Sequence, residues 1–145
     1  MDPLSLTGLT AGLTSLGLQV TGGIITYVDS LRSQSKELES LRRLNEALET
    51  TIDVAQSILN RMPAQNKQLQ DARAQCIDRC KAELNDLDTL VAKFAGMNTS
   101  TWRAQLKEKA KQLRFPFDRE KIQKLADRIV RTNSALSLAL QASGM

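Results

Sequence analysis

The chain has 145 residues, a formal net charge of +4, no histidine and only 3% aromatic residues. This length suits one domain, because a globule of about 150 residues buries roughly 68–70% of the surface of its unfolded chain. A chain without histidine lacks the usual general base and the commonest metal ligand. Few aromatic rings are available to stack on bases. We therefore expect a non-enzymatic protein with no cofactor, no metal and no nucleic-acid partner.

The first 28 residues carry one charged side chain, that of Asp2, whereas all 20 lysines and arginines lie between Arg32 and Arg131. Apolar residues recur in this opening at the three- and four-residue spacing of one helix face. Asp2 followed by Pro3 is a helix start signal, because the carboxylate can accept a backbone N–H and proline presets φ. The apolar face of the predicted helix holds Leu6, Leu9, Leu13, Leu16, Val20, Ile24, Tyr27 and Leu31.

The opposite face of this first helix carries small neutral residues where a solvated helix would carry charge. Gly8 and Gly12 have the four-residue spacing that lets another helix or a lipid headgroup approach the backbone. Each glycine costs about 1 kcal/mol of helix propensity relative to alanine, and we expect Gly22 and Gly23 to interrupt or kink the helix. Two interpretations remain open: a buried bundle helix with tight contacts, and a helix that can leave the bundle for a membrane or an oligomer.

The rest of the sequence predicts four more helices joined by short polar turns. Ser35 is the expected N-cap of the second helix and Asp118 that of the last, and Gly96 is expected to end the third. We predict an all-α fold, an antiparallel bundle of about four long helices plus a short extra helix. It forms a single domain over 1–145, with an uncharged N-terminal helix in 1–33 and the bundle in 34–145. The expected helices after the first cover 35–61, 66–95, 102–113 and the residues that follow Asp118.

Three polar or reactive residues fall on the buried faces of these helices. Cys76 and Cys80 are four residues apart on the third helix, but a structural zinc site needs four ligands and no other cysteine or histidine exists. We interpret both as core cysteines. Asn133 falls on the apolar stripe of the last helix, where a buried asparagine more often fixes register than performs chemistry.

Positive charge gathers toward the C-terminal part of the chain. Residues 46–92 hold eight acids and five bases, whereas residues 103–131 hold ten bases and four acids. A local excess of this kind suits anionic lipid, and the alternative is a solvated helix face. The candidate lipid headgroup ligands are Arg103, Lys107, Lys109, Lys111 and Arg114.

Three passages of the sequence together resemble a known family. They are the start Met1-Asp2-Pro3-Leu4-Ser5, the passage Asp29-Ser-Leu-Arg with Lys36-Glu-Leu-Glu-Ser-Leu, and the closing Leu113-Arg-Phe-Pro-Phe-Asp-Arg-Glu with Ser134-Ala-Leu-Ser-Leu-Ala-Leu-Gln. The whole chain resembles the HeLo-like domain, the N-terminal domain of many fungal STAND (NOD-like) receptors and of stand-alone cell-death effectors. Phe115 stands where the family often has tryptophan.

The resemblance implies a helical bundle that is cytoplasmic at rest, forms homo-oligomers on activation, and then permeabilises the plasma membrane through its N-terminal helix. Its implied partners are anionic membrane lipids and an upstream receptor or amyloid-signalling protein, and we expect the chain to be a domain of a longer protein. The alternative is a signalling or adaptor domain that oligomerises within a receptor without acting on membranes. The candidate membrane-targeting residues are Leu4, Leu6, Gly8, Leu9, Gly12, Leu13, Leu16, Leu18 and Val20.

Overall fold

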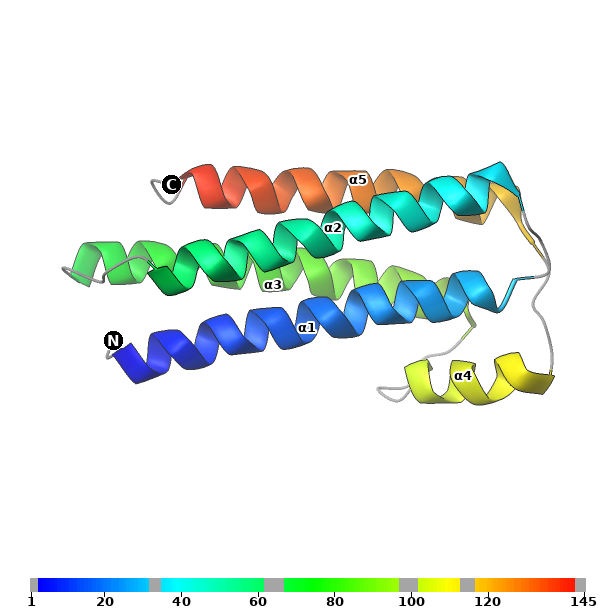
Figure 1. The fold of residues 1–145 in the computed structure, drawn as a ribbon, viewed down its shortest axis with the longest axis horizontal. Helices are drawn as coiled ribbons and strands as arrows, with labels where there is room; N and C mark the ends of the chain where they lie inside the picture. Colours follow the sequence, from blue (N-terminus) through cyan, green and yellow to red (C-terminus); the bar gives the residue numbers. More distant parts are fainter. Residues whose placement is uncertain (1–2, 32–34, 62–66, 97–101, 113–116, 143–145) are drawn as a thin grey trace.

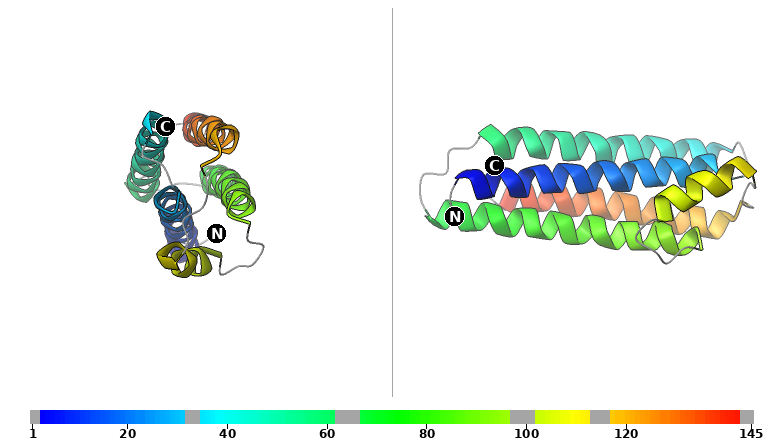
Figure 2. Two further views of the ribbon diagram at one scale, coloured as in Figure 1. Left: turned by 90° about the vertical axis from the view of Figure 1, so that its right-hand side faces the viewer. Right: turned by 90° about the horizontal axis from the view of Figure 1, so that it is seen from below.

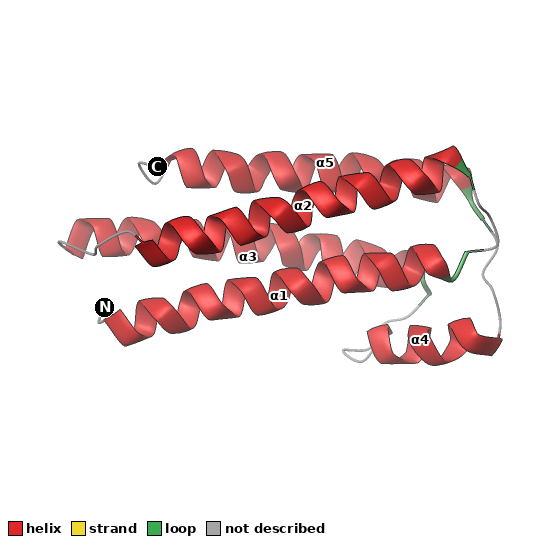
Figure 3. Ribbon diagram, in the orientation of Figure 1, coloured by secondary structure: helices red, strands yellow, loops and turns green. Residues whose placement is uncertain are grey.

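A computed structural model describes the backbone of residues 3–31, 35–61, 67–96, 102–112 and 117–142. Side chains are described within 12–31, 35–58, 67–96, 102–108 and 117–141. These ranges contain five α-helices and no strand, so the predicted all-α fold is confirmed (Figures 1 and 3). The helices are α1 (Pro3–Asp29), α2 (Lys36–Arg61), α3 (Lys67–Phe94), α4 (Trp102–Gln112) and α5 (Arg119–Ala142).

The four long helices form a bundle, and the short α4 lies outside it against α1 (Figure 1). Seen end-on, the order around the bundle is α1, α2, α5 and α3 (Figure 2). Consecutive long helices run in opposite directions, as expected for an antiparallel bundle. Because α2 and α3 lie diagonally opposite each other, the neighbours α1 and α3 run parallel, and so do α2 and α5. This arrangement places α1 between α2 and α3, with α4 on its outer side.

The helix ends follow the local signals in the sequence. The Oγ of Ser35 accepts a hydrogen bond from the backbone N–H of Leu38 at 3.3 Å, which confirms the predicted N-cap of α2. The Oδ1 of Asp118 accepts from the N–H of Glu120 at 3.0 Å and so caps α5. Gly96, two residues after the end of α3, adopts a φ of +74°, as expected for a C-terminal stop. Asp2, Pro63 and the corner at 115–116 lie outside the described residues.

Of the two alternatives expected at Gly22 and Gly23, an interruption or a kink, the interruption was wrong, because α1 continues through both residues to Asp29. Buried side chains anchor the helix on both sides of the pair, with Val20 before it and Ile24 after it. Burying an aliphatic side chain of this size contributes about 1.5–3 kcal/mol. That gain offsets the roughly 1 kcal/mol that each glycine costs in a helix.

The core runs along the inside of the bundle and receives side chains from all five helices. It also contains buried polar residues, including Asn45, Arg73 and Thr132. Asn133, which the sequence placed on the apolar stripe of the last helix, is only half-buried. The fully buried aliphatic side chains include Leu13, Ile24, Leu41, Leu48, Ile52, Ile77, Leu84, Leu87, Leu106, Leu125 and Ile129.

Candidate functional site around the first helix

Helix α1 is packed into the bundle along its described length. Leu13 and Val20 are each 1% exposed, and Leu16 is half-buried against the core. Leu18, also a candidate membrane-targeting residue, is instead 52% exposed, and Ile25 on the same outer face is 39% exposed. The predicted apolar face is therefore the docking face of α1. The side chains of residues 4–11, which include four candidate residues, lie outside the described ones.

The glycines of α1 have different surroundings. A Cβ atom added at Gly17 would lie 2.8 Å from the Cδ1 of Ile52, and one added at Gly23 would lie 2.8 Å from the Cη2 of Trp102. At Gly22 such an atom would meet nothing within 4 Å. Gly17 and Gly23 thus allow α2 and α4 to approach the α1 backbone closely, whereas Gly22 faces open space.

Gly12 lies beneath a cation of α3. A Cβ atom added there would lie 3.0 Å from the Nζ of Lys81, and Gly12 itself is half-buried. The small neutral face was expected to let another helix or a lipid headgroup approach the backbone, and at this position the approaching element is α3. A negative side chain at residue 12 would therefore meet the ammonium group of Lys81 before it met solvent.

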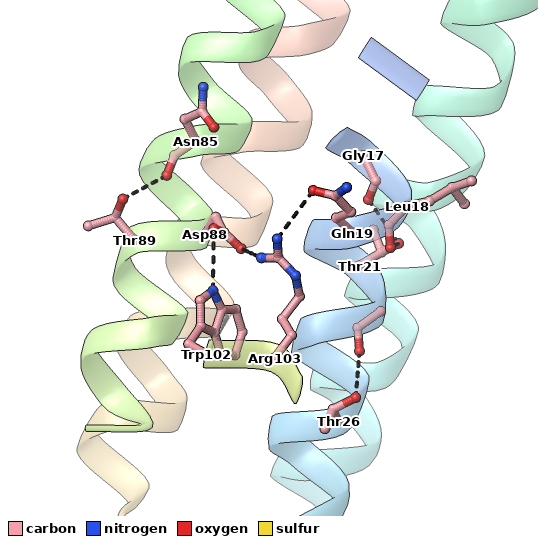
Figure 4. Close-up of polar contacts among 11 residues, drawn as sticks. Gly17, Leu18, Gln19, Thr21, Thr26, Asn85, Asp88, Thr89, Trp102 and Arg103 are labelled. Carbon is pink, nitrogen blue, oxygen red and sulfur yellow. Dashed lines mark hydrogen bonds and ion pairs between the residues drawn. The ribbon is translucent and has the colours of Figure 1, made fainter. Parts of the chain in front are cut away.

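Helix α4 is held against α1 and α3 by a polar cluster that we call the α4 clasp, consisting of Gln19, Asp88, Trp102 and Arg103 (Figure 4). The Oδ1 of Asp88 accepts from the Nη1 of Arg103 at 2.5 Å, and its Oδ2 accepts from the Nε1 of Trp102 at 3.4 Å. The Nη2 of Arg103 donates to the Oε1 of Gln19 at 3.2 Å. The guanidinium carbon of Arg103 lies 5.3 Å from the centroid of the Trp102 ring, within the range of a cation–π contact.

The clasp joins three helices through Arg103. Trp102 is 2% exposed, so its ring is buried over Gly23. The side chains of Arg103 and Asp88 are 28% and 21% exposed, respectively, and both can be reached from solvent. The clasp therefore combines a buried aromatic anchor with an ion pair at its rim.

The predicted headgroup ligands do not share one environment. Arg103 is paired with Asp88, whereas Lys107, one turn further along α4, is exposed. The side chains of Lys109, Lys111 and Arg114 lie outside the described residues. Sequence reasoning did not identify Asp88 or Gln19, which lie 15 and 84 residues from Arg103 along the chain. No spacing rule connects positions so far apart.

A buried hydrogen bond also links α1 to α2. The Nδ2 of Asn45 donates to the backbone carbonyl of Thr21 at 3.0 Å, and Asn45 is fully buried. The Oδ1 of Asn45 has no hydrogen-bond partner among the described residues. A buried acceptor left without a partner costs about 1–3 kcal/mol. The amide group of Asn45 therefore links α1 to α2 through its nitrogen, while its oxygen lacks a hydrogen bond.

The reactive side chains of the core are shielded from solvent. Cys76 and Cys80 are buried, as expected for core cysteines, and the Sγ of Cys76 donates to the carbonyl of Ala139 at 3.3 Å. The hydrogen bond with Cys76 and burial raise the pKa of the Cys80 thiol, which disfavours the nucleophilic thiolate. Within the described part of the chain, no three acidic, cysteine or histidine side chains gather in a way that could hold a metal ion.

Tyr27 is a further buried titratable group near the C-terminal end of α1. Burial, together with the Asp118 carboxylate, raises the pKa of Tyr27 to about 12. The folded protein thus favours the neutral phenol.

Among the described residues, no helix combines the length and the apolar character needed to cross a membrane. Comparisons with protein-family models, curated proteins and solved structures found no match to this chain.

Proposed function

We propose that this chain is a membrane-permeabilising domain that executes programmed cell death, as the resemblance to HeLo-like domains implies. On activation it oligomerises, and α1 leaves the bundle to enter the membrane. The observation that carries the proposal is the charge distribution: α1 has no charged side chain between Pro3 and Val28, whereas every other long helix carries many.

The cost of insertion favours α1 over the other helices. Placing one lysine, arginine or aspartate at the bilayer centre costs about 2.5–3.5 kcal/mol on insertion scales, and the only charged residue of α1 is Asp29 at its C-terminal end. The buried Leu13, Val20 and Ile24 could be reburied among lipid tails once they leave the core. Serine, threonine and glycine interrupt the apolar residues of α1, so we place it in an oligomer or at the membrane interface and not as a lone span.

The second candidate is an adaptor domain that oligomerises without releasing α1. The docking of α1 against α2, α3 and α4 favours it, because release must break all three contacts. Helix α5 also exposes apolar side chains away from α1. Leu138, 65% exposed, lines a groove with Ala82, Ala135 and Ala139, which an adaptor could use to bind other copies.

Leakage from dye-loaded anionic vesicles separates these functions. Ser15 on α1 and Ser57 on α2 are both exposed, so Ser15→Glu and Ser57→Glu make the same chemical change on two helices. We expect both variants to fold, Ser57→Glu to retain leakage and Ser15→Glu to lose it. Full leakage by a folded Ser15→Glu protein would show that α1 does not insert. An intact chain that oligomerises without causing leakage would favour the adaptor function.

A further inference from the structure

We propose that the α4 clasp is an anion-sensitive switch in which phosphate groups on a membrane surface compete with Asp88 for Arg103 and thereby lift α4 off α1. The inference rests on the proposed function, since it identifies the event that would remove α4 from the side of α1 that faces away from the bundle. It follows from one juxtaposition: the guanidinium group that closes the clasp also belongs to the basic segment of the chain.

The clasp depends on a single carboxylate. Asp88 accepts hydrogen bonds from both Trp102 and Arg103, one on each oxygen. Losing Asp88 as a partner would remove these two polar links between α4 and α3. The packing of Trp102 over Gly23, the buried side chain of Leu106 and the bond from Arg103 to Gln19 would still hold α4 against the bundle.

Arg103 is open to competition from outside. Its side chain is 28% exposed, and the exposed Lys107 lies four residues further along α4, on the same helix face. Arginine binds phosphate oxygens in the same bidentate geometry that it uses with carboxylates. An array of lipid phosphates can therefore bind Arg103 and Lys107 together, whereas Asp88 offers Arg103 one carboxylate.

Turning Arg103 toward a membrane would carry Trp102 with it, because the two residues are adjacent and begin α4. The ring of Trp102 would then leave its buried position over Gly23. Two helices, α2 and α3, would remain in contact with α1 where three had been. Binding of the basic segment to the membrane and loosening of α1 thus become one event.

Trp102 is the only tryptophan of the chain, so its fluorescence reports directly on the clasp. The test titrates the intact protein with vesicles of phosphatidylcholine alone, with vesicles containing phosphatidylserine, and with inorganic phosphate at the same phosphate concentration. We expect a red shift and easier quenching by acrylamide with the phosphatidylserine vesicles only. An unchanged Trp102 spectrum in protein bound to these vesicles would overturn the proposal, as would an equal shift with inorganic phosphate or neutral vesicles.

Asp88→Asn tests the role of the carboxylate, and Asp53→Asn on the exposed face of α2 is the matched control. We expect Asp88→Asn to show the red-shifted spectrum without vesicles and the control to match the unaltered protein. A folded Asp88→Asn protein with a buried tryptophan spectrum would contradict the proposal. The vesicle titration uses the unaltered chain, so it decides the question even if Asp88→Asn does not fold.

The same samples separate the clasp from the proposed function. A red shift with anionic vesicles but no dye leakage would support the clasp and contradict permeabilisation. Leakage without any change at Trp102 would support permeabilisation and overturn the clasp. The two conclusions therefore have separate readouts.

Discussion

Replacing Gly12 by glutamate should stabilise the resting bundle. The Cβ atom of the new residue would lie 3.0 Å from the Nζ of Lys81, and the flexible end of a lysine can shift by a few tenths of an ångström. Replacing glycine by glutamate improves the helix propensity at this position by roughly 0.5 kcal/mol. An ion pair between the new carboxylate and Lys81 at this half-buried site adds about 0.5 kcal/mol. We expect a total gain of about 1 kcal/mol in the free energy of unfolding.

The assay is chemical and thermal unfolding followed by circular dichroism. A gain of about 1 kcal/mol raises the Tm of a domain of this size by about 2–4 °C. Gly12→Gln is the neutral control, and Gly12→Glu combined with Lys81→Ala tests the ion pair in a double-mutant cycle. Destabilisation by Gly12→Glu, or an equal gain when Lys81 is absent, would refute the reasoning.

Three further predictions concern α1 and the residues that pack against it. Gly22→Ala should stabilise the protein by about 1 kcal/mol, whereas Gly23→Ala should destabilise it by about 1–3 kcal/mol because the Trp102 ring must move. Urea unfolding measures both changes, and equal effects would contradict the close packing of Trp102 on Gly23. The pKa of Tyr27 is about 12 in the folded protein and about 10 in the unfolded chain, so its neutral phenol contributes stability below pH 10 that is lost as the pH rises toward 12. The unfolding free energies of the unaltered protein and of Tyr27→Phe should therefore diverge between pH 10 and pH 12, and parallel curves would show that the phenol titrates normally. Asn45→Leu should change the free energy of unfolding by less than about 1 kcal/mol, because it removes an unpartnered acceptor along with one hydrogen bond, whereas Leu48→Ala in the same core should cost about 2–5 kcal/mol. A comparable loss in both variants would mean that both polar atoms of the Asn45 side chain have hydrogen-bond partners.

Local signals in the sequence were sufficient for most of the fold. The caps at Ser35 and Asp118 involve atoms within three residues of each other, so composition and spacing predict them. The interruption at Gly22 and Gly23 was a wrong prediction because propensity describes an isolated helix. The burial of Val20 and Ile24 is a tertiary effect that propensity does not include.

The candidate site could be predicted only in part. Periodicity identified Leu13 and Val20 as one face of a helix, and that face is buried. It could not distinguish a neutral face that meets solvent from one that meets α3, which is why Lys81 over Gly12 was not foreseen. The clasp was also missed, because Asp88 reaches Arg103 only through the arrangement of α3 and α4.

The burial of α1 bears directly on how its charge pattern can be tested. A charge at a position covered by another helix changes the resting bundle as well as any inserted state. At Gly12 the two effects act in the same direction, because a glutamate there would pair with Lys81 and hold α1 in place while also opposing insertion. Loss of leakage by Gly12→Glu would therefore not identify its cause. Ser15 is exposed in the resting state, so a charge there bears mainly on the inserted state, and Ser15→Glu is the more decisive test of membrane insertion.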